Sequence, residues 1–279
     1  MHRRGTMVNM EPVAWTVTAR NLADHAGNAI HTDAGARAAG FPGALVAGVT
    51  TYAYLTHPIV EAWGVDWLAS GTAEIRFRSP VFDRDLLELR PAPRVDGGVL
   101  VEAVRSGSPE PLATMVARRP VIEPPAGRRP GEELEPTAVI LDGQWGSDYG
   151  WRAGDDLSIY AERGVVHPAA WPALANHITH AQVVRGSWIH TRSLIRHHAL
   201  APVGAAAFIR ATVIDRFTRP AGERAVLDVT IDVEGIRVAT IEHEAIVAVT
   251  RTDRWGRSPH PTIRSASLSL PIRGTDRCS

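Results

Sequence analysis

The stretch that decides the fold reads Asn28-Ala-Ile-His31-Thr-Asp33, resumes as Gly40-Phe-Pro-Gly43-Ala-Leu-Val-Ala-Gly48, and continues into Val-Thr-Thr-Tyr-Ala-Tyr-Leu. It places an imidazole and an amide just before the glycine-rich start of an apolar helix. The first N–H groups of a helix have no partner within it, and the helix dipole adds positive charge there. Such a start suits a carbonyl oxygen that gains negative charge during a reaction. The stretch therefore predicts a general base, His31, beside an oxyanion site.

These residues resemble the signature of the MaoC-like (R)-specific enoyl-CoA hydratases and dehydratases. That signature has the form Gly-Asp-x-Asn-Pro-x-His-x-Asp, followed by an alanine, Gly-Phe and a glycine-rich helix start. The positions that match it here are Asn28, His31, Asp33, Gly40, Phe41 and Gly48. The resemblance implies the hot-dog fold and a hydro-lyase that adds or eliminates water at the α,β-bond of an acyl thioester. It also implies that CoA or an acyl carrier protein delivers the substrate.

Two positions depart from that signature. The catalytic aspartate of the family lies five residues before the histidine, where this chain has Ala26, and the proline after the asparagine is Ala29. Asp24 is the carboxylate that a shifted loop would bring back, and His25 is the other nearby group that can replace it. The departure leaves open an isomerase or cyclase acting on a specialised substrate, or a non-catalytic acyl-binding protein.

Composition excludes several classes of function. The 279 residues contain 30 basic residues, all arginine, and 30 acidic ones, so the formal net charge is zero. The absence of lysine excludes Schiff-base catalysis, and zero net charge argues against nucleic-acid or anionic-membrane partners. The single Cys278 leaves no disulfide framework and no thiolate metal site. We expect no cofactor and no metal.

The distribution of apolar residues along the chain bears on the cellular location of the protein. No apolar run approaches the roughly 18 residues that span a bilayer, and no apolar stretch of a signal peptide follows Met1-His-Arg-Arg. We therefore expect a cytoplasmic protein.

Apolar alternation and turn residues predict an α+β unit in the first half, residues 11–122. A strand over about 13–18 precedes the motif, and Asp33 is expected to cap a short helix. A long helix over about 45–63 has Gly64 as its stop signal. The predicted strands that follow are 72–78, 85–90, 99–104 and 112–117.

The same order recurs after a Pro- and Gly-rich linker, residues 123–140. A predicted helix over about 169–184 comes first, and the predicted strands are 187–195, 206–215, 225–232 and 238–248. Two such units, 11–122 and 141–252, predict a double hot dog, in which the halves replace the subunits of a homodimer. Residues 253–279 are predicted to form a mobile tail. Monomer and homodimer both stay open.

The candidate site residues follow from the motif. His31 is the predicted acid–base group, and Asp24 is the possible replacement carboxylate. Asn28 either orients the imidazole, a water or the substrate, or only braces the loop through an Asx turn. Substrate binding is assigned to Gly43, Gly48, Val49 and Tyr52, at and after the helix start. The second half has no copy of the Asn-x-x-His motif, which predicts one active site per chain, between the halves.

Other polar residues give weaker signals. Arg76 and Arg78 alternate with apolar neighbours, so they are expected on one face of a strand, where they are solvated or meet a phosphate of the substrate. His177, His180 and His190 are metal-ligand types, but no carboxylate stands at a matching position. They favour a helix packed on a sheet over a metal site. A thioesterase needs a carboxylate near the central helix, and only Glu61 lies on it, at the far end.

Overall fold

Five strands of the first half surround one long helix, α2 (Gly48–Ser70). The computed structural model of the protein describes residues 10–25, 27–119 and 127–249. All strand pairs are antiparallel, and the first five strands run in the order β1-β3-β4-β5-β2. Their bounds are β1 (Trp15–Thr18), β2 (Thr72–Phe77), β3 (Leu86–Pro93), β4 (Val99–Arg105) and β5 (Pro111–Arg118).

The helix α2 is buried through most of its length, because the sheet and the second half cover it on several sides. Tyr52, Tyr54 and Trp67 are fully buried in it. The helix breaks at Gly64, as expected, and a second helical stretch that was not predicted follows it. Gly64 has a φ of 62°, which kinks the chain there, and helical structure resumes as far as Ser70. Glycine takes that left-handed conformation at little steric cost.

The second half repeats the arrangement around α5 (Ala170–Gln182). Its long strands are β8 (Ile189–His197), β9 (Ala206–Arg219), β10 (Gly222–Val233) and β11 (Ile236–Val249). Four short elements absent from the sequence expectations precede them: β6 (Glu132–Glu133), β7 (Thr137–Ile140), α3 (Tyr149–Ala153) and α4 (Ile159–Arg163). Both β6 and β7 pair with β9.

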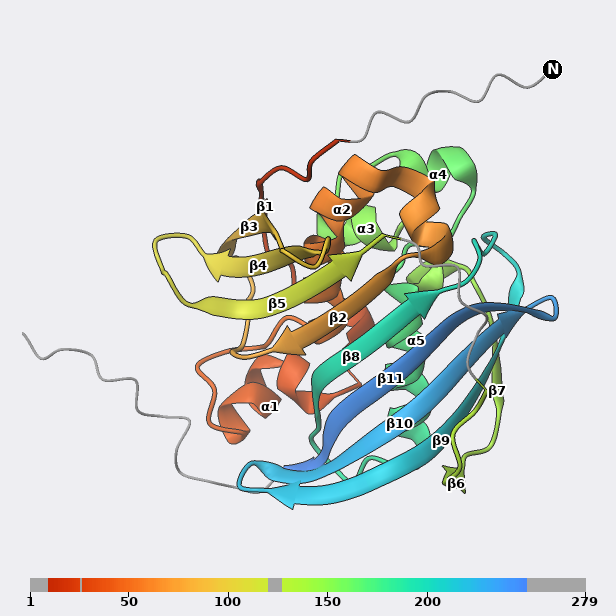
Figure 1. Ribbon diagram of the computed structural model, residues 1–279. Coiled ribbons are helices and arrows are strands. Elements are labelled where there is room, and N and C mark those ends of the chain that lie inside the picture. The colour runs from red at the N-terminus through yellow and green to blue at the C-terminus, as the bar shows by residue number, and fades with distance from the viewer. Residues whose placement is uncertain (1–9, 26, 120–126, 250–279) are drawn as a thin grey trace, which may run out of the picture.

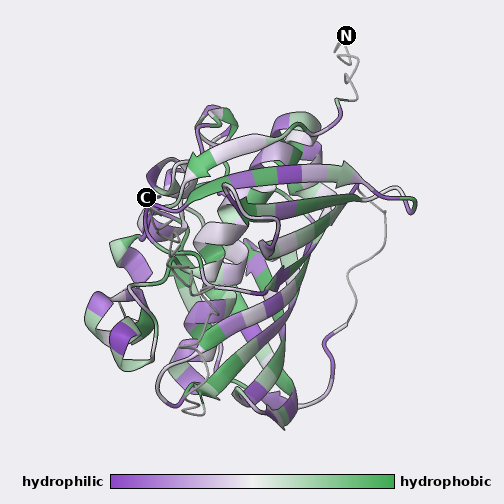
Figure 2. Cartoon of the chain, turned by 90° about the vertical axis from the view of Figure 1, so that its left-hand side faces the viewer, coloured by the Kyte–Doolittle hydropathy of each residue, from purple (hydrophilic) through white to green (hydrophobic). Residues whose placement is uncertain are grey.

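The two halves share one continuous sheet, which confirms the predicted double arrangement. Strand β2 of the first half pairs with β8 of the second, with Ile75 opposite Ser193. The sheet curves around α2 and α5, and apolar and polar residues alternate along its strands (Figures 1 and 2). Residues 123–126 of the predicted linker and all of the predicted tail (253–279) lie outside the described residues, so the domain boundaries stay predictions.

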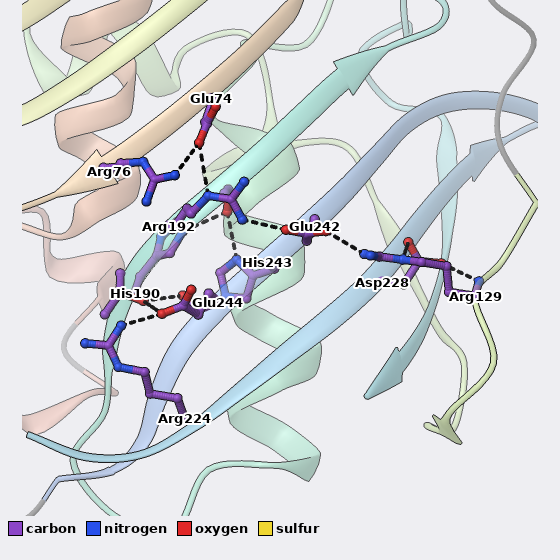
Figure 3. A network of polar contacts seen from close by, with 12 residues as sticks. Glu74, Arg76, Arg129, His190, Arg192, Arg224, Asp228, Glu242, His243 and Glu244 are labelled. Atoms are coloured by element: carbon purple, nitrogen blue, oxygen red, sulfur yellow. Dashed lines mark hydrogen bonds and ion pairs between the residues drawn. The ribbon is translucent and has the colours of Figure 1, made fainter. Parts of the chain in front are cut away.

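A row of charges crosses this joint on the outer face of the sheet (Figure 3). Arg192 on β8 pairs with Glu74 on β2, at 3.2 Å, and with Glu242 on β11. Arg129, which precedes β6, continues the row by contacting Glu242 at 2.9 Å and Asp228 through its backbone N–H at 3.0 Å. The row therefore connects both halves and the segment before β6. None of the helices within the described ranges is long and apolar enough to cross a membrane.

Candidate functional site

The motif loop is built from three short turns. They are two 3-10 helices, Ala23–His25 and Ala29–His31, and the helix α1 (Asp33–Ala38). Thr32 caps α1, because its hydroxyl accepts a hydrogen bond from the Gly35 N–H at 3.2 Å. The expectation that Asp33 is the cap was wrong. Asp33 is the first helical residue, and its carboxylate accepts from the Ala44 N–H at 3.0 Å, which fastens the loop before α2.

His31 is held in one orientation. Its Nδ1 lies 2.8 Å from the carbonyl oxygen of Leu45, which can only accept, so Nδ1 carries the proton. The other nitrogen, Nε2, makes no hydrogen bond to any residue that the structure describes, which leaves it as an acceptor for a ligand. Burial lowers the pKa of His31 below 6.5, and the bond to Leu45 opposes this shift. The imidazole is therefore neutral near pH 7, as a general base must be.

Asn28 joins the two halves at this point. Its Nδ2 donates to the backbone carbonyl of Trp188, at 3.0 Å, in the segment that leads into β8. Its Oδ1 is buried and makes no hydrogen bond within the described part of the chain. The amide therefore braces the motif loop against the second half.

The start of α2 lies close to the sheet. A Cβ at Gly48 would lie 3.1 Å from Cζ of Phe77, so glycine allows this close approach. Gly48 and Val49 line the same cavity as His31, and as the first two residues of the helix they have no intrahelical partner for their N–H groups. Gly43 and Tyr52 do not line it: Gly43 faces Asp33, and Tyr52 is fully buried in the core.

This cavity has a volume of about 410 Å³ and is lined by both halves. The first half contributes the motif loop, the start of α2 and residues that follow β2. The second half contributes one face of α5 and the beginning of β8. Polar and aromatic side chains from the second half include Trp145, Asn176, His177, Trp188, His190 and Arg224. The cavity lies where the sequence predicts the site, between the halves.

Asp24 lines the cavity, but its carboxylate is already paired with a cation. Its carboxylate forms an ion pair with Arg152 of α3, which also contacts Asp148 at 3.3 Å. Among the described residues that line the cavity, Asp24 is the only carboxylate. Ala26, where the resemblance expects the aspartate, lies outside the described residues. The site as described therefore holds no carboxylate without a cationic partner.

His25, one residue from Asp24, also lines the cavity. Its Nε2 lies 3.1 Å from the hydroxyl of Tyr149 in α3 and 3.4 Å from that of Thr50 in α2. Burial, the nearby His31 and Arg152 lower its pKa to about 4, against the opposing charge of Asp24. The sequence offered His25 only as a neighbour of Ala26, because its partner Tyr149 lies more than a hundred residues away.

The two arginines after α2, Arg76 and Arg78, lie in different places. Arg76 pairs with Glu74 at 2.7 Å on the outer face of the sheet (Figure 3). Arg78 comes after the end of β2 and lines the cavity. The expectation that both share one strand face was therefore wrong, because the strand ends at Phe77.

The histidines of the second half do not gather into a metal-ligand set. His177 and His180 of α5 contact the rings of Trp145 and Trp188. His190 donates to or accepts from Ser193, at 2.8 Å, and Ser193 contacts His243, at 3.0 Å (Figure 3). His177, His180 and His190 all line the cavity, and Nδ1 of His190 and Nε2 of His243 make no hydrogen bond to a described residue.

A different group brings potential ligand atoms together within the described ranges. Those of His57, Asp155 and Asp156 lie within 4.8 Å of one another. Hydrogen bonds account for this group: His57 Nε2 lies 2.9 Å from Asp156, and His167 Nε2 lies 3.1 Å from Asp155. The group is a polar contact between α2 and the segment that follows α3, away from the cavity.

Gly35 lets α1 pack against the turn that carries His31. A Cβ at Gly35 would overlap the backbone carbonyl of Ala29, whose carbon would lie only 2.6 Å away. Gly35→Ala is therefore expected to lower the free energy of unfolding by about 2 kcal/mol, the usual size of overpacking effects. Denaturant unfolding measures this. Gly27→Ala is the control, because a Cβ there meets nothing within 4 Å; equal stabilities of the two variants would contradict the prediction.

No family model and no curated protein matches the chain. Solved structures do match. A conserved hypothetical protein from Mycobacterium tuberculosis with a double hot-dog fold has a TM-score of 0.62 at 12% identity, over 85% of this chain and 96% of that one. A candidate MaoC-domain dehydratase from Chloroflexus aurantiacus has a TM-score of 0.56 at 11% identity, over 89% and 99%.

A candidate oleoyl thioesterase from Lactobacillus plantarum has a TM-score of 0.51 at 9% identity, over 88% of this chain and 100% of that one. At these identities the comparisons show the fold. The chain has the double hot-dog fold that MaoC-like dehydratases and thioesterase-like proteins share, which confirms the α+β double hot dog expected from the sequence.

Proposed function

We propose that the protein is an enzyme acting on acyl thioesters, and more narrowly a hydro-lyase that adds or eliminates water at the α,β-bond. One observation carries the proposal: the acceptor nitrogen of His31 and the first N–H groups of α2 belong to one cavity. Dehydratases and thioesterases are both found among proteins of this fold. The fold is therefore compatible with both water addition or elimination and thioester hydrolysis, and the residues that line the cavity favour one of them.

In the proposed hydration, His31 Nε2 takes a proton from water as the water oxygen bonds to the β-carbon. The electron pair of the double bond moves toward the thioester, whose oxygen gains negative charge. The N–H groups of Gly48 and Val49 are the proposed donors to that oxygen, and a single donor of this kind contributes about 3 kcal/mol. His31 then returns the proton to the α-carbon.

Thioester hydrolysis has less support. It calls for a carboxylate that acts as nucleophile or base, and the described cavity offers only Asp24, which Arg152 neutralises. Glu61 is exposed on α2 and does not line the cavity.

Arg78 is the proposed contact for a phosphate of CoA or a carrier protein, because it is exposed and lines the cavity. The proposed location of the protein is the cytoplasm.

The test mixes the protein with trans-2-enoyl and 3-hydroxyacyl thioesters, linked to CoA or to a pantetheine carrier. Loss of the enoyl absorbance without release of free thiol is the expected result. Release of thiol would instead establish a thioesterase. Unchanged absorbance across the panel would contradict the hydro-lyase, and tight binding of saturated thioesters alone would identify an acyl-binding protein.

A further inference from the structure

Two of the imidazoles that line the proposed catalytic cavity, His25 and His31, belong to the motif loop. The ring centroids of His25 and His31 lie 5.9 Å apart. The two histidines are held by different halves of the molecule: the carbonyl of Leu45 fixes His31, and Tyr149 of α3 contacts His25. Tyr149 is fully buried, so its hydroxyl is a fixed partner.

The hydrogen bond to the Leu45 carbonyl places the proton of His31 on Nδ1, and two arrangements fit His25. The hydroxyls of Tyr149 and Thr50 lie 2.8 Å apart, and either can be the donor. In the proposed arrangement Tyr149 donates to Thr50, and its oxygen accepts from Nε2–H of His25, at 3.1 Å. A neutral imidazole has one donor and one acceptor nitrogen. In this arrangement Nδ1 of His25 is an acceptor, as Nε2 of His31 is, and neither nitrogen makes a hydrogen bond to a described residue.

We propose that His25 is a second catalytic residue, and that one water molecule bridges His25 Nδ1 and His31 Nε2. The inference rests on the proposed water addition and elimination. Two hydrogen bonds of roughly 3 Å each fit between rings at the observed separation. The water donates both hydrogens, which directs its lone pairs toward the β-carbon. Burial keeps both rings neutral, which preserves the two acceptors.

The reaction then balances without a carboxylate. One O–H bond of the water breaks and its proton moves to His31 Nε2, while the new C–O bond forms at the β-carbon. The electron pair of the double bond passes toward the thioester, and the proton of His31 completes the α-carbon. His25 keeps its own proton throughout. Its Nδ1 accepts a hydrogen bond from the O–H that remains in the product hydroxyl. Tyr149 is a positioning residue that acts through His25.

The experiment compares His25→Leu with His25→Asn in an enoyl-thioester hydration assay. Leucine has no acceptor, whereas asparagine carries an amide oxygen near the position of Nδ1. We expect His25→Leu to lower kcat by about 100-fold with little change in KM, and His25→Asn to stay within about tenfold of the native protein. Unfolding curves and binding of a saturated acyl thioester verify that both variants fold and bind.

Coupling to the other residues distinguishes catalysis from a structural role. Because His25 and His31 act on one water, the variant with both His25→Leu and His31→Asn is expected to lose little more than His31→Asn alone. Tyr149→Phe is expected to lower kcat in the native protein but not in the His25→Leu background. The same loss in both backgrounds would assign Tyr149 a structural role and overturn the positioning argument.

The outcomes separate this inference from the proposed function. If His31→Asn abolishes turnover and folded His25→Leu keeps at least a third of the native kcat, the role of His25 is wrong and the hydro-lyase stands. If His25→Asn falls as far as His25→Leu, the acceptor role is wrong. If the native protein turns over no thioester, the proposed function fails first.

Discussion

Replacing His31 with asparagine is expected to lower kcat/KM for water addition to an enoyl thioester by about 10²–10⁴-fold, the usual contribution of a general acid–base group. This corresponds to about 3–5 kcal/mol of transition-state stabilisation. Asparagine retains an amide N–H that can donate to the Leu45 carbonyl, as Nδ1 does over 2.8 Å. It has no counterpart of Nε2, so the variant removes only the base.

His198→Asn is the matched control. His198 is half-buried, its Nε2 lies 2.9 Å from the hydroxyl of Thr240, and it does not line the cavity. Its replacement is expected to leave kcat/KM within about twofold of the native value, in line with a surface substitution. If both variants keep native activity while the native protein is active, His31 is not the base, and the cavity acts through another group.

Acid is expected to unfold the protein at a pH between about 4 and 5.5, the second large effect. His190, His197 and His243 are buried, and burial lowers the pKa of all three, to about 3 for His197 and His243. Below pH 6.5 the unfolded chain binds protons at these rings and the folded chain does not. Folding stability is therefore complete above pH 6.5 and falls as pH decreases toward 3.

The size of this loss follows from linkage. At pH 5, His197 and His243 each favour the unfolded state by about 2 kcal/mol, which gives roughly 4 kcal/mol in total, and the burial of His190 acts in the same direction. Folded domains of this kind typically have 5–15 kcal/mol of stability. Urea unfolding at pH 7.5, 6 and 5 measures the change. A free energy of unfolding that stays constant between pH 7.5 and 5 would contradict the prediction.

His197→Leu tests one ring separately. Neither ring nitrogen of His197 makes a hydrogen bond to a described residue, and the ring packs against Trp67 at 4.9 Å. The variant is expected to remove about 2 kcal/mol of the destabilisation that acid causes at pH 5. At pH 7.5 it is expected to gain roughly 1 kcal/mol, because leucine leaves no polar atom unpaired. A variant as acid-sensitive as the native protein would show that His197 does not contribute.

Local patterns in the sequence predicted most of the strands, and the motif that they flank lines the cavity between the halves. Alternation of apolar and polar residues located β2, β4, β5 and β11 to within a few residues. The errors came from competing local signals. Thr32 and Asp33 are both good helix caps, and only the bond from Gly35 shows which one is used. Gly64 does break the helix, but nothing in the sequence indicated the second helical stretch after it, which buries Trp67 and Leu68 in the core.

The contacts that complete the site could not be read from the chain. Tyr149 reaches His25, Arg152 neutralises Asp24, and Trp188 accepts from Asn28, each across more than a hundred residues. All three belong to the half that lacks the motif. A motif match locates the imidazole, but the residues that hold it depend on how the two halves meet.

The continuous sheet through β2 and β8 has an evolutionary consequence. In a homodimer of single hot dogs, every substitution appears twice, so a change that adjusts substrate choice also alters the surroundings of the other catalytic loop. In this fused chain the copies mutate separately. The face of α5 that carries Asn176 and His177 can therefore change without any change in the loop of His31, although both line one cavity.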